Sequence, residues 1–129
     1  MRRLALAPCL TLLLCASAAL ADPEMECPGG SQIEIGACLR DTLERVDDTV
    51  ETAYSYALIA AAEIDSATGR PTAAPALEAA QGAWNAYRDA HCAYIGETFS
   101  GGSGTSLGIA SCRIMLGRDR VATLLELAR

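Results

Sequence analysis

Apolar residues recur at intervals of three and four over most of the chain, the period of an α-helix with one buried side. The longest series begins after Ser31 and ends before the Gly-Arg-Pro sequence at 69–71, which is typical of a helix end. Ser31 and Glu34 have the spacing of a capping box at the helix start. We therefore expect a long first helix. Its apolar stripe consists of Leu39, Leu43, Val46, Val50, Ala53, Ala57, Ala60 and Ile64.

Two more helices follow. The second is expected to begin between Thr72 and Pro75, because proline is tolerated in the first turn of a helix. It ends at Gly101 and Gly102, and the third runs from about Ser106 to the C-terminus. The stripe of the second helix is Leu77, Ala80, Trp84, Tyr87, His91 and Tyr94 or Ile95. The stripe of the third is Leu107, Ala110, Ile114, Gly117, Val121, Leu124 and Ala128.

Three helices with short connections predict an all-α fold, an antiparallel three-helix bundle stapled by two disulfides. No strand pattern or internal repeat accompanies them. The helical domain covers residues 32–129, and residues 22–31 form an extended N-terminal lead with two prolines and two glycines.

Residues 1–21 have the three parts of a secretory signal peptide. Arg2 and Arg3 give a positive start, an apolar run follows from Leu4 to Leu14, and Ala19-Leu20-Ala21 forms a cleavage site before Asp22. The apolar run is shorter than the roughly 20 residues of a membrane-spanning helix. We therefore predict a periplasmic or secreted protein with no stable membrane insertion after cleavage.

A lipid anchor is the alternative, since the signal segment contains Cys9 and Cys15. A lipidated cysteine follows a small residue, whereas these follow Pro8 and Leu14. The order of residues thus favours a cleaved, unanchored chain.

Cleavage leaves 108 of the 129 residues, enough for one domain with a hydrophobic core. All ten basic residues are arginine, and the mature chain keeps eight of them against sixteen acidic residues, a net charge of −8. Such an acidic chain will not bind nucleic acid by charge, but it suits a basic partner.

The four cysteines of the mature chain predict two disulfides, because an even number in a small exported protein is typical of a disulfide framework. Their gaps lack the short spacing of zinc sites, and the chain has a single histidine, so we expect no metal. Three pairings are possible. Cys92 and Cys112 each lie ten residues from Gly102, at the same height in a helical hairpin, which favours their pairing and leaves Cys27 with Cys38.

The sequence contains no recognisable catalytic motif. His91 lies beside Cys92, but a thiol nucleophile needs a free Cys92, and a half-buried structural histidine explains the position as well. Redox C-x-x-C, haem-attachment and Glu-x-x-His motifs are absent. We expect a protein that is not an enzyme and binds no cofactor, with an enzyme using His91 and Cys92 as the remote alternative.

An acidic row runs along the first helix, away from its apolar stripe. It predicts either a solvated surface or a docking surface for a basic protein. Paired carboxylates for glycoside chemistry would need a cleft, which a convex helix face does not offer. The candidate partner-binding residues are Asp41, Glu44, Asp48 and Glu51, with Asp47 beside them.

The most distinctive stretch surrounds the only tryptophan. Counting from Gly102 places Trp84 level with Arg120, within reach of a cation–π contact. The pattern Q-x-x-W-x-x-Y-R-D-A-x-C, followed by G-G-S, A-S-C and a later arginine, resembles the LprI-type lysozyme inhibitor N-terminal domain family. These positions are Gln81, Trp84, Tyr87, Arg88, Asp89, Ala90, Cys92, Gly101, Gly102, Ser103, Ala110, Ser111, Cys112 and Arg120; Cys27, Gln32, Glu34 and Cys38 fit as well.

The resemblance covers nearly the whole mature chain and implies a small helical envelope domain that inhibits lysozyme-type muramidases, which are commonly basic. It suggests that the motif residues are scaffold rather than contact surface. Two partner classes stay open: a basic muramidase, or another envelope protein for which the chain is a structural or adaptor domain. The loop from Gly101 to Ser106 is a second candidate contact surface.

Overall fold

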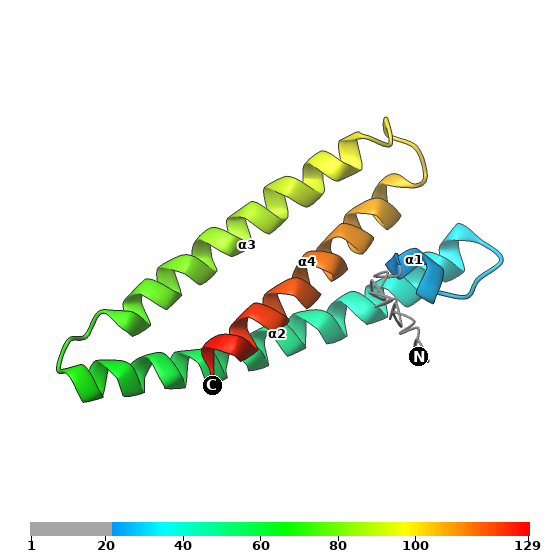
Figure 1. Cartoon of the computed structure of the whole chain (residues 1–129). Helices are drawn as coiled ribbons and strands as arrows, with labels where there is room; N and C mark the ends of the chain where they lie inside the picture. The colour runs from blue at the N-terminus through cyan, green and yellow to red at the C-terminus, as the bar shows by residue number, and fades with distance from the viewer. Residues whose placement is uncertain (1–21) are drawn as a thin grey trace, which may run out of the picture.

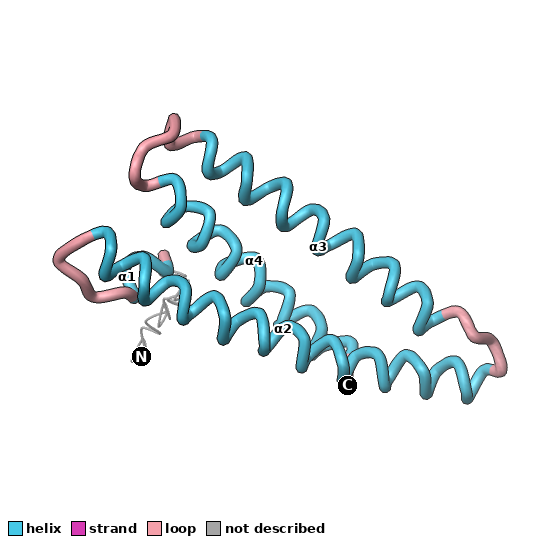
Figure 2. The backbone as a smooth tube through the Cα atoms, turned by 180° about the vertical axis from the view of Figure 1, so that it is seen from behind, coloured by secondary structure: helices cyan, strands magenta, loops and turns pink. Residues whose placement is uncertain are grey.

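The computed structural model describes residues 22–129, and in this part of the chain it contains only helices: α1 (Pro23–Glu26), α2 (Gln32–Thr68), α3 (Ala73–Glu97) and α4 (Thr105–Leu127). α2 and α3 run in opposite directions, and α4 returns between them (Figure 1). Seen from behind, the loops lie at the two ends of the bundle (Figure 2). The predicted all-α fold is confirmed, and the predicted signal segment lies outside the described residues.

Both ends of α2 follow the sequence signals. The Ser31 hydroxyl accepts the Glu34 N–H at 3.3 Å, and the Glu34 carboxylate accepts the Gly30 N–H at 2.9 Å. These bonds satisfy N–H groups that have no partner inside the helix. At the other end, Gly69 adopts a left-handed conformation, with φ of 64°, that glycine adopts without strain.

The start of α3 is capped by a residue of α2. The Asp65 carboxylate accepts the N–H groups of Thr72, Ala73 and Ala74 at 2.9, 2.7 and 3.0 Å. These bonds, the one from Ala73 first, lower the pKa of Asp65 below its ordinary value. The carboxylate therefore joins the two helices at their turn and opposes the positive end of the α3 dipole.

The core consists of two clusters along α2. One, at the disulfide end, contains Cys27, Leu39, Leu107 and Ile114. The other contains Val50, Ala53, Ala57 and Leu124. Most of the predicted stripes of α2 and α4 are therefore confirmed.

The stripe prediction is wrong at the far end of α2. Ala61 is buried rather than Ala60, and Ile64 is 56% exposed. For Ile64 the reason is length: the end of α4 lies beside Tyr56, Ala60 and Glu63, so the residues of α2 after Glu63 extend beyond α4 (Figure 1).

The inner side of α3 also differs from the prediction. Ala80, Tyr87 and Tyr94 are exposed, Tyr94 by 66%, whereas Gln81 is buried and the Arg88 side chain is only 12% exposed. The apolar period places Tyr87 and either Tyr94 or Ile95 inside, and of the last two Ile95 is the partly buried one. The helix is instead rotated so that two polar residues face the bundle, where their hydrogen-bonding groups find partners.

The two disulfides have the predicted pairing. Cys27 is joined to Cys38 and Cys92 to Cys112, with Cα atoms 5.7 and 5.6 Å apart. These distances lie within the usual range for a disulfide. One bond ties the lead to α2, and the other ties α3 to α4.

The lead is not extended throughout, so that prediction is wrong at residues 23–26. Asp22 accepts the Glu24 N–H at 3.0 Å and starts the single turn of α1. Glu26 then forms two hydrogen bonds with Arg118 of α4, at 2.8 and 2.7 Å. None of the helices in residues 22–129 is long and apolar enough to cross a bilayer.

Candidate functional site

Two guanidinium groups lie over the ring of Trp84. The Cζ atoms of Arg88 and Arg120 lie 5.2 and 5.6 Å from the centroid of its ring. Both are within cation–π range, and the contact with Arg120 confirms the level predicted from the hairpin. The only tryptophan thus joins α3 to α4.

Gln81 completes this contact from one turn earlier on α3. Its Oε1 accepts the Arg120 Nε–H at 2.9 Å, and its Nε2 donates to Asn85 Oδ1 at 3.4 Å. Arg120 forms no ion pair within the described residues, and burial lowers its pKa from the ordinary value. The side chains of Gln81 and Trp84 therefore hold a cation that no carboxylate neutralises.

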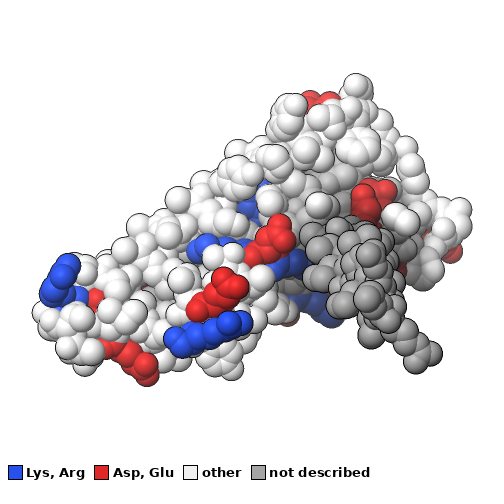
Figure 3. All heavy atoms as spheres, in the orientation of Figure 1, with Lys and Arg blue, Asp and Glu red and all other residues white. Residues whose placement is uncertain are grey.

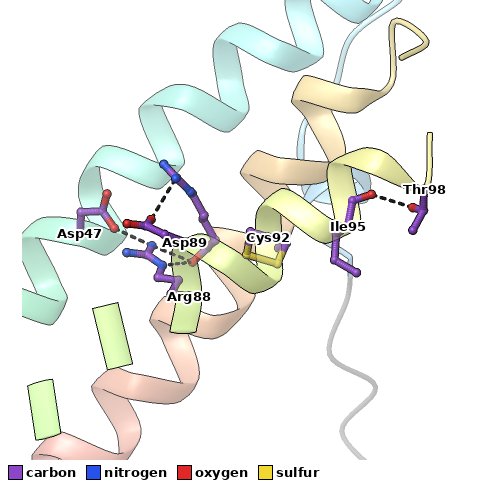
Figure 4. The surroundings of a disulfide bond; sticks show 8 residues. Asp47, Arg88, Asp89, Cys92, Ile95 and Thr98 are labelled. Carbon is purple, nitrogen blue, oxygen red and sulfur yellow. Dashed lines mark hydrogen bonds and ion pairs between the residues drawn. A yellow bond between two sulfur atoms is a disulfide. The ribbon is translucent and has the colours of Figure 1, made fainter. Parts of the chain in front are cut away.

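Arg88 joins all three long helices. Its Nε and Nη2 donate to the Arg113 carbonyl of α4 at 3.1 and 2.7 Å, and Nη2 also donates to Asp47 of α2 at 2.6 Å. Figure 4 shows this arrangement next to the disulfide of Cys92. A planar guanidinium has the fixed donors that such a junction requires. The carboxylate that pairs with Arg88 therefore lies on α2 and not on α4.

Asp89 does pair with the third helix, through Arg113 at 2.9 Å. This contact is more exposed than the Asp47–Arg88 pair, since the Asp89 side chain is 69% exposed. Exposed pairs contribute little, typically about 0–1 kcal/mol. Of the two adjacent motif residues, we therefore expect Asp89 to contribute less to stability than Arg88.

Of the remaining motif residues, Tyr87, Gly101 and Gly102 lie at the surface. Tyr87 stacks on His91, with ring centroids 5.3 Å apart. Gly101 has φ of 75° at the turn between α3 and α4, where a side chain would be strained. Gly102 accepts the Thr105 N–H at 3.0 Å. These residues shape the hairpin end without forming a site.

The acidic row becomes a ridge on the outward side of α2. We call Asp41, Glu44, Asp48 and Glu51 the acidic ridge; all four are exposed, and none makes an ion pair with another described residue. Asp47 is separate from them, because it pairs with Arg88. The view from the α4 side shows acidic and basic side chains close to one another, so that face is of mixed charge (Figure 3).

A groove lies between α2 and α3, beside the acidic ridge. We call it the α2–α3 groove; it has a volume of about 290 Å³. Its lining includes Asp47, Glu51, Tyr54, Trp84, Asn85 and Arg88. One residue of the ridge, Glu51, is thereby placed next to the motif residues.

Sequence reasoning missed Tyr54 and Asn85. Tyr54 follows Asp47 by two helical turns, and Asn85 follows Gln81 by one, so each lies on the same side of its helix as a residue already singled out. What the sequence lacks is the position of α3 relative to α2. Without it, these positions cannot be placed in one groove.

A second cavity, of about 260 Å³, lies between α1, α3 and α4. It is lined by apolar side chains such as Ile95, Phe99 and Leu116, together with His91. Cys92, next to His91 in sequence, is disulfide-bonded and cannot act as a thiol nucleophile in this state. No cluster of potential metal ligands occurs in residues 22–129.

Comparison with known proteins gives one family. The model of the family described as lysozyme inhibitor LprI matches residues 25–124. An uncharacterized protein of Rhizobium meliloti (strain 1021) is 34% identical over 131 residues, which span 95% of this chain and 94% of the relative. No solved structure matches the chain. The matched range contains both disulfides and every motif residue.

Proposed function

The chain belongs to the lysozyme inhibitor LprI family, and from this premise we propose that it is an exported inhibitor of lysozyme-type muramidases. The observation that carries the proposal is the match over residues 25–124, which includes all of α2 and α3 and most of α4 rather than one motif. A binding protein needs a stable surface more than catalytic groups. The stapled bundle supplies such a surface.

The charge distribution supports a basic partner. The mature chain would have a net charge of −8, and the acidic ridge holds four carboxylates that no described arginine neutralises. Opposite charges raise the rate at which two proteins meet and favour correct orientation. We therefore place the first contact with a basic muramidase on the acidic ridge.

The residues and the disulfide bonds together support export. The signal-like pattern in residues 1–21 directs the chain out of the cytoplasm, and both disulfides are stable in an oxidising compartment. A muramidase acts on peptidoglycan in the same place. We propose the periplasm or the medium as the working location.

The test is an inhibition assay with the purified, oxidised chain of residues 22–129. A basic lysozyme should clear a suspension of bacterial cells more slowly as the protein is added, with saturation at a fixed molar ratio. An acidic muramidase is the matched control, and we expect weaker inhibition of it. If calorimetry detects no binding to the basic enzyme and clearing is unchanged, the proposal is wrong, and an adaptor function with another envelope protein replaces it.

A further inference from the structure

We propose that the α2–α3 groove receives a basic side chain of the muramidase, an arginine or a lysine, with Glu51 as its counter-ion. This inference rests on the proposed function and specifies where the partner is held. The acidic ridge alone does not identify a contact, because exposed carboxylates are also common on surfaces without partners. The groove adds a defined cavity next to one of them.

The charges in the groove favour a cation. Asp47 is paired with Arg88, whose guanidinium also donates twice to the Arg113 carbonyl. Arg88 is therefore already occupied and offers little to an anion. Glu51 is the one charged group of the lining without an ion pair among the described residues, so an entering ammonium or guanidinium would find an unpaired carboxylate.

The size of the groove fits one long side chain. Its volume of about 290 Å³ lies just below the roughly 300–1,000 Å³ of pockets that enclose small-molecule ligands. Trp84 gives an apolar wall for the methylene stem of the entering residue. Tyr54 and Asn85 add polar groups near Glu51.

The lining is also held in place before any partner arrives. Trp84 contacts two guanidinium groups, and Arg88 is fixed by bonds to α2 and α4. Binding into a preformed site costs little conformational entropy. This is a consequence of the motif residues being scaffold: they keep the shape of a groove whose contact residue, Glu51, is outside the motif.

The experiment compares Glu51→Gln with Glu44→Gln in the purified, oxidised chain. Both changes remove one carboxylate from an exposed position of α2, but only Glu51 lines the groove. We expect Glu51→Gln to weaken binding of a basic lysozyme at least about tenfold, mainly through faster dissociation, because a desolvated charge pair is lost. Glu44→Gln should change affinity less than about threefold, through slower association. Surface plasmon resonance separates the two rates.

A second measurement reports directly on the groove. The chain has one tryptophan, so a 5-fluorotryptophan label gives a single ¹⁹F signal from Trp84. Adding unlabelled lysozyme should shift this signal in the parent chain and in Glu44→Gln, at concentrations where Glu51→Gln is still unshifted. Circular dichroism confirms that both variants are folded.

The outcomes are distinguishable. If the parent chain inhibits the enzyme and the two variants bind equally, or the Trp84 signal is unchanged in the complex, the groove is not the contact and the proposed function stands. If the parent chain neither binds nor inhibits, both proposals are wrong.

Discussion

The inner side of α3 and the outer side of α2 both carry polar groups, yet the two sides differ in what satisfies those groups. Gln81 and Arg88 of α3 are hydrogen-bonded to residues of α2 and α4 within the bundle. The carboxylates of the acidic ridge form no ion pair with any described residue. The polar groups of Gln81 and Arg88 are satisfied by other residues of the chain. The carboxylates of the acidic ridge are left to interact with water or with another protein.

This difference separates architecture from function. Removing a buried polar group leaves its partner unsatisfied, which costs free energy of unfolding. Changing an exposed carboxylate leaves the fold intact and acts on encounter with a partner. Each substitution below therefore tests whether a residue stabilises the fold or contributes to binding.

The largest effect is expected from Trp84→Ala. The free energy of unfolding should fall by about 3 kcal/mol, the lower end of the range for a large aromatic side chain, because part of the ring is exposed. Tyr94→Ala is the matched control on the same helix, at a 66% exposed residue, and should stay within about 0.5 kcal/mol of the parent. Urea denaturation measures both. Equal stability of the two variants would show that Trp84 does not join the helices.

The second effect concerns the bond between α3 and α4. Replacing Cys92 and Cys112 together by serine should lower the free energy of unfolding by about 3 kcal/mol. The same change at Cys27 and Cys38 should cost slightly less, since the cysteines are 11 residues apart rather than 20 and the closed loop is shorter. Thermal denaturation of the two double variants tests the order, and a larger loss at the lead would contradict it.

The sequence predicts α2 and α4 better than α3 for a physical reason. The ends of α2 depend on Ser31, Glu34 and Gly69, which act within one turn of the helix, and its buried residues are apolar. The inner side of α3 depends on Gln81 and Arg88, which are buried only because partners from distant parts of the chain reach them. A period of apolar residues contains no information about such partners.

The candidate site also combines features that the sequence predicts with features that it does not. The acidic ridge is readable from spacing along a single helix, and its residues are exposed as a surface row should be. The α2–α3 groove requires two helices to be placed relative to each other. The Asp65 cap of α3 was missed as well, because its acceptor lies seven to nine residues before the N–H groups that it binds.

A smaller effect is expected at the other end of the bundle, from Asp65→Asn. The pKa of Asp65 is lower in the folded protein than in the unfolded chain, so its carboxylate contributes stability above about pH 4 that is lost as the pH falls through the folded value. The variant should therefore melt lower than the parent at pH 7, and the difference should shrink as the pH falls below about 4. Glu63→Gln, on the exposed side of the same helix, is the charge-matched control. A constant difference between Asp65→Asn and the parent across this pH range would rule out the charged cap.

The smallest effect on stability, and the clearest on binding, is expected from Asp48→Arg with Glu51→Arg. Stability should stay within about 0.5 kcal/mol, because both residues are exposed. Association with a basic lysozyme should slow about tenfold at low salt and less at physiological salt, where the Debye length is about 8 Å.

The control for this pair is Glu63→Arg with Glu78→Arg, which makes the same change of net charge outside the ridge. Stopped-flow or surface plasmon resonance measures the association rates. If the control pair slows association equally, the partner responds to the total charge and the ridge has no special role.

Both disulfides join cysteines that are consecutive within residues 22–129, Cys27 with Cys38 and Cys92 with Cys112. A chain that crosses a membrane from its N-terminus presents the first pair before either cysteine of the second pair has emerged. Closing a short loop also costs less entropy than closing the long one between Cys38 and Cys92. If the chain is exported as proposed, an oxidant that joins thiols in their order of arrival makes the native pairs first, and no disulfide isomerase is needed.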